Sequence, residues 1–166
     1  QHDRQYGHSE QRRHRREEHR RTLDLDSNSV SANQGLGIAY SLTGRHEEAI
    51  GALGRALALS QNSPVVMGQL GAALARQGNR AAAAKMLADL KTLSDRAYVP
   101  ASSFAVVHAA LGDHAQALDW LERAYDEHDF SMPRLGIAPW FQPLRGEPRL
   151  AALLGHAIGR AATSLA

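Results

Sequence analysis

Residues 36–59 (LGIAYSLTGRHEEAIGALGRALAL) return 34 residues later as residues 70–93 (LGAALARQGNRAAAAKMLADLKTL), and this repeat decides the fold. Six positions keep one register under the shift, and three of them hold through three consecutive units. The matching sets are Leu36 and Leu70; Gly37 and Gly71; Gly44, Gly78 and Gly112; Ala49, Ala83 and Ala117; Leu53, Leu87 and Leu121; and Leu59 and Leu93. A fixed period of this length is the signature of a protein whose units stack on one another.

Each unit divides at a glycine into two amphipathic stretches, which in the first unit cover about 30–43 and 46–59. Their apolar residues recur at three- and four-residue spacing, as a one-sided helix requires. Gly44 and its equivalents stand where a helix ends in a left-handed residue. Gly37 and Gly71 fall inside the first helices, where glycine costs about 1 kcal/mol relative to alanine. We therefore expect these glycines, and Ala49 with its equivalents, at close helix crossings.

This pattern resembles the tetratricopeptide repeat (TPR) over roughly residues 30–126. The resemblance is carried by Leu-Gly near the start of the unit, Tyr40 three residues later, then the turn glycine, an alanine, a bulky apolar residue and Ala56 or Ala124. It implies an all-α fold, a right-handed superhelix of antiparallel helix pairs closed by a C-terminal capping helix. The units implied are 30–63, 64–97 and 98–127. The third unit departs from the pattern, because Phe104-Ala105 replaces Leu-Gly and His108 replaces Tyr40.

The C-terminal residues 128–166 are predicted to form a loop and the capping helix. Glu147-Pro148 favours a helix start, since proline is suited to the first helical position. Trp140, Phe141 and Leu144 form an apolar cluster of the kind that a terminal element needs to cover the last repeat. The stretch PWFQPLRGEPR, residues 139–149, also resembles the segment after the repeats in bacterial TPR-bearing regulators, such as winged-helix transcription factors and adenylate cyclases. That resemblance implies a regulatory protein whose effector domain lies upstream.

The N-terminal residues differ from the body in charge. Residues 1–22 carry seven arginines and four acidic residues, a net charge of +3, which leaves −1 for the remaining 144 residues. We interpret them as a basic polar arm, either a helical extension or disordered, and residues 23–29 as the remnant of a preceding repeat. The arm is the basis of an alternative function, nucleic-acid binding through phosphate contacts. Glu17 and Glu18 interrupt the basic run, which favours a solvated charged face instead.

Composition and motifs exclude several other classes. Cysteine is absent, so neither disulfides nor thiol chemistry is available. The apolar runs fall short of the ~20 residues that span a bilayer, and the charged N-terminus lacks the apolar core of a signal peptide; we expect a cytoplasmic protein. Phosphate-loop, serine-nucleophile and zinc-helix motifs do not occur. We expect no enzyme activity and no cofactor.

The nine histidines raise the question of a metal site. His2, His8, His14 and His19 are spaced by six, six and five residues, which does not bring two imidazoles to one helix face. Packing explains the equivalent positions of His46 and His114 better than metal binding does. His108 falls on a core-facing position, and we expect it to be hydrogen-bonded there. No metal is predicted.

The candidate functional site follows from the resemblance, since the first helices of successive TPR units line a concave groove. The positions implied are Gln34, Ile38, Ser41, Leu42, Gly68, Ala72, Ala75, Arg76, Ser102, Val106, Ala109 and Ala110. Such a groove is small-residue and apolar, and apart from Arg76 it lacks the basic set with which some TPR proteins grip acidic tails. It suits an amphipathic helix or a neighbouring domain, with a second copy of the chain as another occupant. The predicted function is a non-catalytic protein-interaction scaffold.

Overall fold

The computed structural model describes residues 14–19, 28–129 and 139–163, and these residues contain helices and turns without any β-strand. The elements are α2 (Val30–Leu42), α3 (His46–Leu59), α4 (Pro64–Gln77), α5 (Arg80–Ser94), α6 (Ala101–Leu111), α7 (His114–Asp126), the 3₁₀ helix η2 (Pro139–Leu144) and α8 (Pro148–Thr163). The fold is all-α, as the periodicity predicts.

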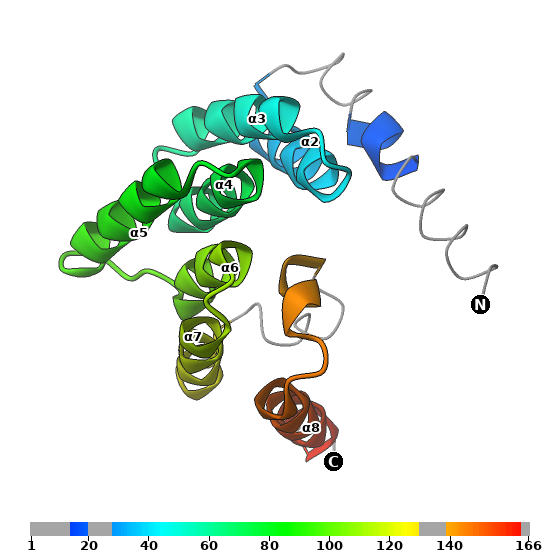
Figure 1. Cartoon of the computed structure of the whole chain (residues 1–166), viewed down its shortest axis with the longest axis vertical. Coiled ribbons are helices and arrows are strands. Elements are labelled where there is room, and N and C mark those ends of the chain that lie inside the picture. The colour runs from blue at the N-terminus through cyan, green and yellow to red at the C-terminus, as the bar shows by residue number, and fades with distance from the viewer. Residues whose placement is uncertain (1–13, 20–27, 130–138, 164–166) are drawn as a thin grey trace.

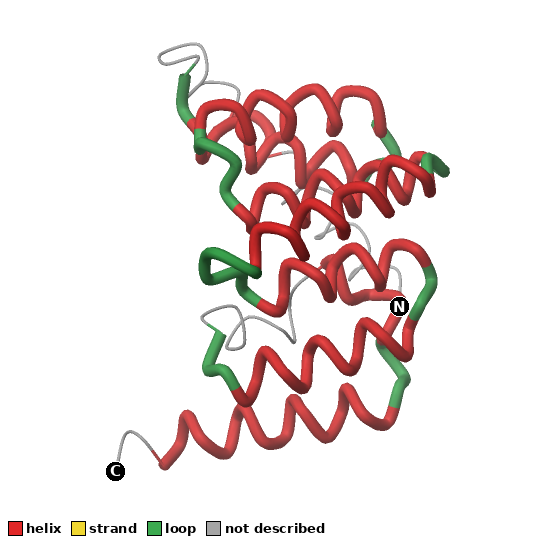
Figure 2. Tube along the Cα trace, turned by 90° about the vertical axis from the view of Figure 1, so that its left-hand side faces the viewer, coloured by secondary structure: helices red, strands yellow, loops and turns green. Residues whose placement is uncertain are grey.

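The helices form an arc of antiparallel pairs. Figure 1 shows α2, α4 and α6 on the inner side of the arc, with α3, α5 and α7 outside them. Viewed from the side, the helices are stacked in successive layers (Figure 2). The predicted helical-repeat solenoid is thereby confirmed.

Each first helix ends at the glycine that the repeat places there. Gly44, Gly78 and Gly112 have φ angles of +75°, +93° and +81°, in the left-handed region that glycine adopts without steric strain. The next residues then start the second helix; Asn79 and Asp113, for example, each accept a backbone N–H in the first turn that follows. The regular turn explains why the glycine recurs every 34 residues.

Several small residues at the repeat positions have close neighbours. Ala49, Ala83 and Ala117 are fully buried. A Cβ added at Gly37 would meet the side chain of Leu53 and the carbonyl oxygen of Ala49. Close approach of the backbones is therefore the reason that these positions carry glycine or alanine.

In the third unit, Phe104 occupies the position that leucine occupies in the other two units. Phe104 is buried and stacks on Trp120, with the ring centroids 4.2 Å apart and the planes 11° from parallel. It belongs to a cluster with Met67, Leu90 and Val99, which lies between the second and third helix pairs. The larger side chain thus fills a space in this interface.

The last helix covers α7, which matches the predicted role of a capping helix. α8 begins at Pro148, and its Leu150 and Leu153 are buried in the same cluster as residues of α6 and α7. Outside this apolar contact, the Arg149 guanidinium bonds Glu122 at 2.8 Å and Asp119 at 2.7 Å. These two carboxylates raise the pKa of Arg149, so the pairing remains charged.

The arm and the proposed repeat remnant fall mainly outside the described residues. Residues 14–19 are helical, and His14 lies 3.3 Å from the Glu18 carboxylate one turn later. Residues 1–13 and 20–27 are not described. The interpretation of 23–29 as part of a preceding repeat therefore stays a prediction.

Candidate functional site: the concave groove

The twelve groove positions predicted from the repeat divide into two sets of six. Half are partly exposed and belong to the inner helices α2, α4 and α6: Gln34, Ile38, Leu42, Ala75, Arg76 and Ala110. The other half are buried: Ser41, Gly68, Ala72, Ser102, Val106 and Ala109. The groove is therefore open only in part, and the rest of the chain explains why.

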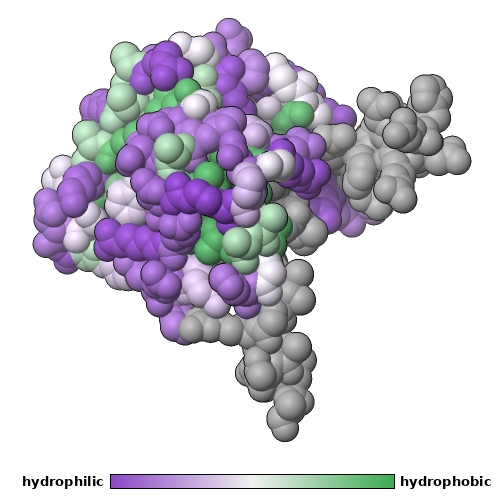
Figure 3. Space-filling model, turned by 60° about the horizontal axis from the view of Figure 1, so that its bottom comes forward, coloured by the Kyte–Doolittle hydropathy of each residue, from purple (hydrophilic) through white to green (hydrophobic). Residues whose placement is uncertain are grey.

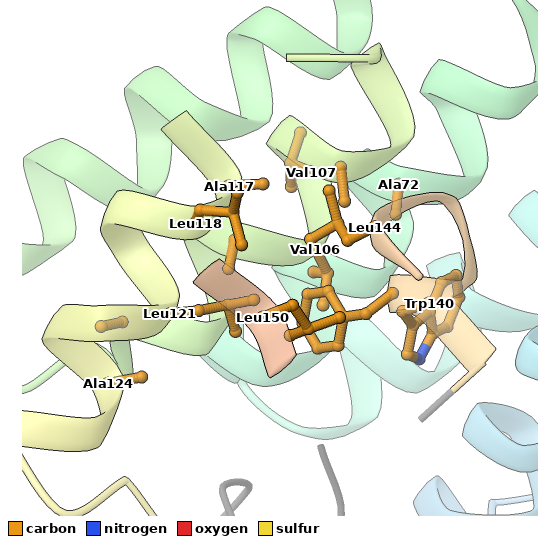
Figure 4. Packing of buried hydrophobic residues seen from close by; sticks show 14 of the residues in the cluster. Ala72, Val106, Val107, Ala117, Leu118, Leu121, Ala124, Trp140, Leu144 and Leu150 are labelled. Carbon is orange, nitrogen blue, oxygen red and sulfur yellow. The ribbon is translucent and has the colours of Figure 1, made fainter. Parts of the chain in front are cut away.

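The chain's own 3₁₀ helix η2 lies against the inner face. Figure 1 shows it on the concave side beside α6. Trp140, Phe141 and Leu144 are 7%, 5% and 0% exposed, and all three share one cluster with Ala72 of α4 and Val106 of α6. Figure 4 shows the labelled side chains of α4, α6, α7 and the C-terminal segment gathered around this interior. The third-repeat end of the groove is thus filled by residues from the chain itself.

Arg76 marks the boundary between the filled and the open part. Its guanidinium carbon lies 4.7 Å from the centroid of the Trp140 ring, a cation–π contact. Its Nη1 donates to the Ser41 hydroxyl at 3.3 Å. Burial lowers the pKa of Arg76, and among the described residues no carboxylate lies within ion-pair distance of it. The guanidinium of Arg76 in the groove is therefore partly desolvated, and it contacts an aromatic ring and a hydroxyl group.

Gly68 and Ser102 are buried by contacts that the repeat pattern alone does not reveal. A Cβ at Gly68 would lie 2.6 Å from the carbonyl oxygen and 3.0 Å from the Cα of Ser103, so α4 and α6 meet backbone to backbone here. The backbone N–H of Ser102 donates to Asp129 Oδ2 at 3.1 Å, which satisfies a free donor in the first turn of α6. Both residues face protein rather than an open groove.

The open part lies at the first repeat. Gln34 of α2 donates through Nε2 to Gln69 Oε1 of α4 at 2.9 Å, so the two side-chain amides bridge neighbouring inner helices. Ile38 packs on the edge of the cluster that contains Trp140, whereas Leu42 is partly exposed. Polar amides beside partly exposed aliphatic side chains form a surface suited to another polypeptide rather than to a small charged ligand.

The histidines that raised the metal question are dispersed. Among the described residues, no group of three or more His, Asp and Glu side chains is placed to hold a metal ion. His108 Nδ1 lies 3.4 Å from the Asp113 carboxylate, and His114 Nδ1 lies 3.6 Å from that of Glu147 next to the start of α8. The pair at His114 was not foreseen; it joins the third repeat to the segment that leads into the cap.

A shallow depression lies between α7 and α8. It has a volume of about 360 Å³ and is lined by Glu122, Tyr125, Asp126, Arg149, Ala152, Leu153 and His156. The face of the molecule in Figure 3 is mainly hydrophilic, with small hydrophobic areas between the polar residues. Two of its lining residues, Arg149 and Glu122, form an ion pair with each other. Moreover, none of the described helices is both long and apolar enough to cross a membrane.

The arc of antiparallel helix pairs, with left-handed glycines between the helices and small residues at their crossings, defines an α-helical repeat protein. Sequence models of the tetratricopeptide repeat match residues 34–64, 64–89 and 104–123. These segments of the chain are therefore similar to the tetratricopeptide repeat. No curated protein and no solved structure matches the chain. Repeats of this type indicate a scaffold for protein–protein interaction, a class that is generally non-catalytic.

Proposed function

We propose that this chain is a non-catalytic scaffold that binds a helix or a neighbouring domain of a partner protein along α2, α4 and α6. The observation that supports this proposal is the seating of η2, because an apolar segment is held there mainly through its side chains. The partly exposed aliphatic residues Ile38 and Leu42 extend that apolar surface toward the first repeat, with the amide of Gln34 beside them. A partner that lies along this extension would bury apolar area without needing charged groups.

We propose further that the scaffold is the sensory or assembly part of a bacterial regulator. The support is the resemblance of residues 139–149 to the segment that follows the repeats in such regulators. Inspection of the full-length gene product tests this point. An upstream winged-helix, cyclase or kinase domain would agree with the proposal, and an unrelated enzyme domain would contradict it.

The groove itself is tested with two matched leucine substitutions. Leu42→Glu places a charge on the partly exposed inner face, whereas Leu59→Glu places the same charge on α3, where Leu59 is 38% exposed. Each full-length variant is used for affinity capture from the source cells, followed by mass spectrometry. We expect proteins captured by the wild-type chain to be lost with Leu42→Glu and kept with Leu59→Glu. Equal capture by both variants, with unchanged helical circular dichroism, would exclude the inner face as the binding surface.

A further inference from the structure

The 3₁₀ helix η2 contacts the groove with one side only. Trp140, Phe141 and Leu144 are buried, whereas Gln142 and Pro143 between them are exposed. Contacts at the second, third and sixth positions of η2, with solvent on the opposite side, are the arrangement of a peptide ligand in a groove. A peptide of another protein can make the same contacts.

The receptor surface for this segment comes from two different repeats. Ala72 of α4 and Val106 of α6 share the cluster with Trp140 and Leu144, and Arg76 of α4 lies over the Trp140 ring at 4.7 Å. The interfaces between the first and second pairs and between the second and third pairs have clusters of their own, which contain no residue of η2. Much of the packing between repeats therefore does not depend on the segment.

Arg76 allows this surface to select among peptides, because η2 offers its guanidinium an aromatic ring and no carboxylate. The guanidinium is partly desolvated and contacts a ring and a hydroxyl, with no carboxylate in ion-pair distance among the described residues. A charge-assisted hydrogen bond to a carboxylate is stronger than a neutral one. A peptide that combines the aromatic residue with a nearby acid would consequently interact better with Arg76 than η2 does.

We propose that the α4–α6 part of the groove recognises a partner peptide with a tryptophan followed four residues later by a leucine, and with an acidic residue next to the tryptophan. Residues 139–144 are the chain's built-in copy of this peptide, and the partner binds by displacing them. The inference rests on the proposed scaffold function and names the chemistry of its partner. In this proposal η2 competes with the partner for the groove, so the strength of its binding there determines the affinity that a partner needs to displace it.

The test measures binding of a fluorescein-labelled peptide of residues 139–146 (PWFQPLRG) to full-length chains by fluorescence anisotropy. Trp140→Ala removes the aromatic residue from the built-in segment, and Gln142→Ala is the matched control at an exposed position. An attached competitor acts at an effective concentration in the millimolar range. We therefore expect Trp140→Ala to bind the peptide at least about ten-fold more tightly than the wild-type chain or Gln142→Ala.

Two further peptides and one double variant test the recognised chemistry. Replacement of Pro139 by glutamate in the peptide, next to the tryptophan, should increase affinity, and replacement of its tryptophan by alanine should abolish binding. The double variant Trp140→Ala/Arg76→Ala should lose the gain from the added glutamate. If both peptides bind with the same affinity to chains with and without Arg76, the acidic preference is wrong.

Two outcomes would overturn the inference as a whole. Trp140→Ala that keeps its helical circular dichroism and does not bind the peptide shows that the groove does not recognise the segment as a ligand. Trp140→Ala that loses its helical signal at room temperature shows that η2 is an integral part of the core and not displaceable. Either result leaves the scaffold proposal testable, because partner capture that depends on Leu42 but not on Leu59 is measured with chains that retain Trp140.

Discussion

Gly68→Ala is the sharpest test of how the second and third repeats meet. Alanine is favoured over glycine in a helix interior by about 1 kcal/mol, so the substitution would stabilise an unobstructed helix. At Gly68, however, the added Cβ would lie 2.6 Å from a backbone oxygen of Ser103, which no side-chain rotation relieves. Overpacking of this type costs about 1–3 kcal/mol. With the clash at the upper part of that range, we expect a net loss of roughly 1–2 kcal/mol in the free energy of unfolding.

Gly54→Ala in α3 is the matched control, because a Cβ there would meet no atom within 4 Å. It should gain roughly 0.5–1 kcal/mol, which separates the two variants by about 2 kcal/mol. For an m-value of roughly 2 kcal/mol/M, that is a difference of about 1 M in the urea midpoint, followed by circular dichroism at 222 nm. If Gly68→Ala is as stable as Gly54→Ala at equal m-values, the backbone contact between α4 and α6 is not as close as the structure shows.

Two other substitutions test the ends of the third repeat. Asp129 is 2% exposed and accepts the Ser102 N–H, so Asp129→Ala should lower the free energy of unfolding by about 1.5–3 kcal/mol. The control Asp95→Ala, at an exposed position, should change it little. Equal urea midpoints for the two variants would contradict the capping role of Asp129. Arg149→Ala should lower the melting temperature at low salt but not at about 1 M salt, since exposed ion pairs are screened. A loss that persists at high salt would indicate that packing by Arg149, rather than its charge, holds α8.

The groove shows which features of a binding surface can be predicted from residue patterns and which cannot. The inner helices could be assigned because the repeat places equivalent residues at equivalent angles around each helix, and Ile38, Ala72 and Val106 do lie toward the inner side. Which of those positions are free could not be assigned in the same way. Their exposure depends on where Trp140 and Leu144 are placed, and these residues come from outside the repeats.

The cap shows a related difference. Glu147-Pro148 indicated a helix start correctly, because the preference of proline for the first turn is local. Trp140 and Phe141 were expected to cover the last repeat, but the sequence did not indicate which of its surfaces they would contact. α8 covers α7, whereas η2 turns into the groove, where Arg76 contacts Trp140. A hydrophobic cluster has no preferred direction, so its destination depends on which apolar surface the chain can reach.

Taken alone, the sequence determined the properties that repeat with the chain: the 34-residue period, the paired helices, the left-handed glycines such as Gly44, and the small residues at crossings such as Ala49. These follow from local backbone preferences and from the near-neighbour packing that identical units share. Only the tertiary structure decided that Gly68 touches a backbone, that Asp129 caps α6, and that η2 fills the third-repeat end of the groove. Each of those depends on contacts between residues far apart in the chain, and such contacts leave no period in the sequence.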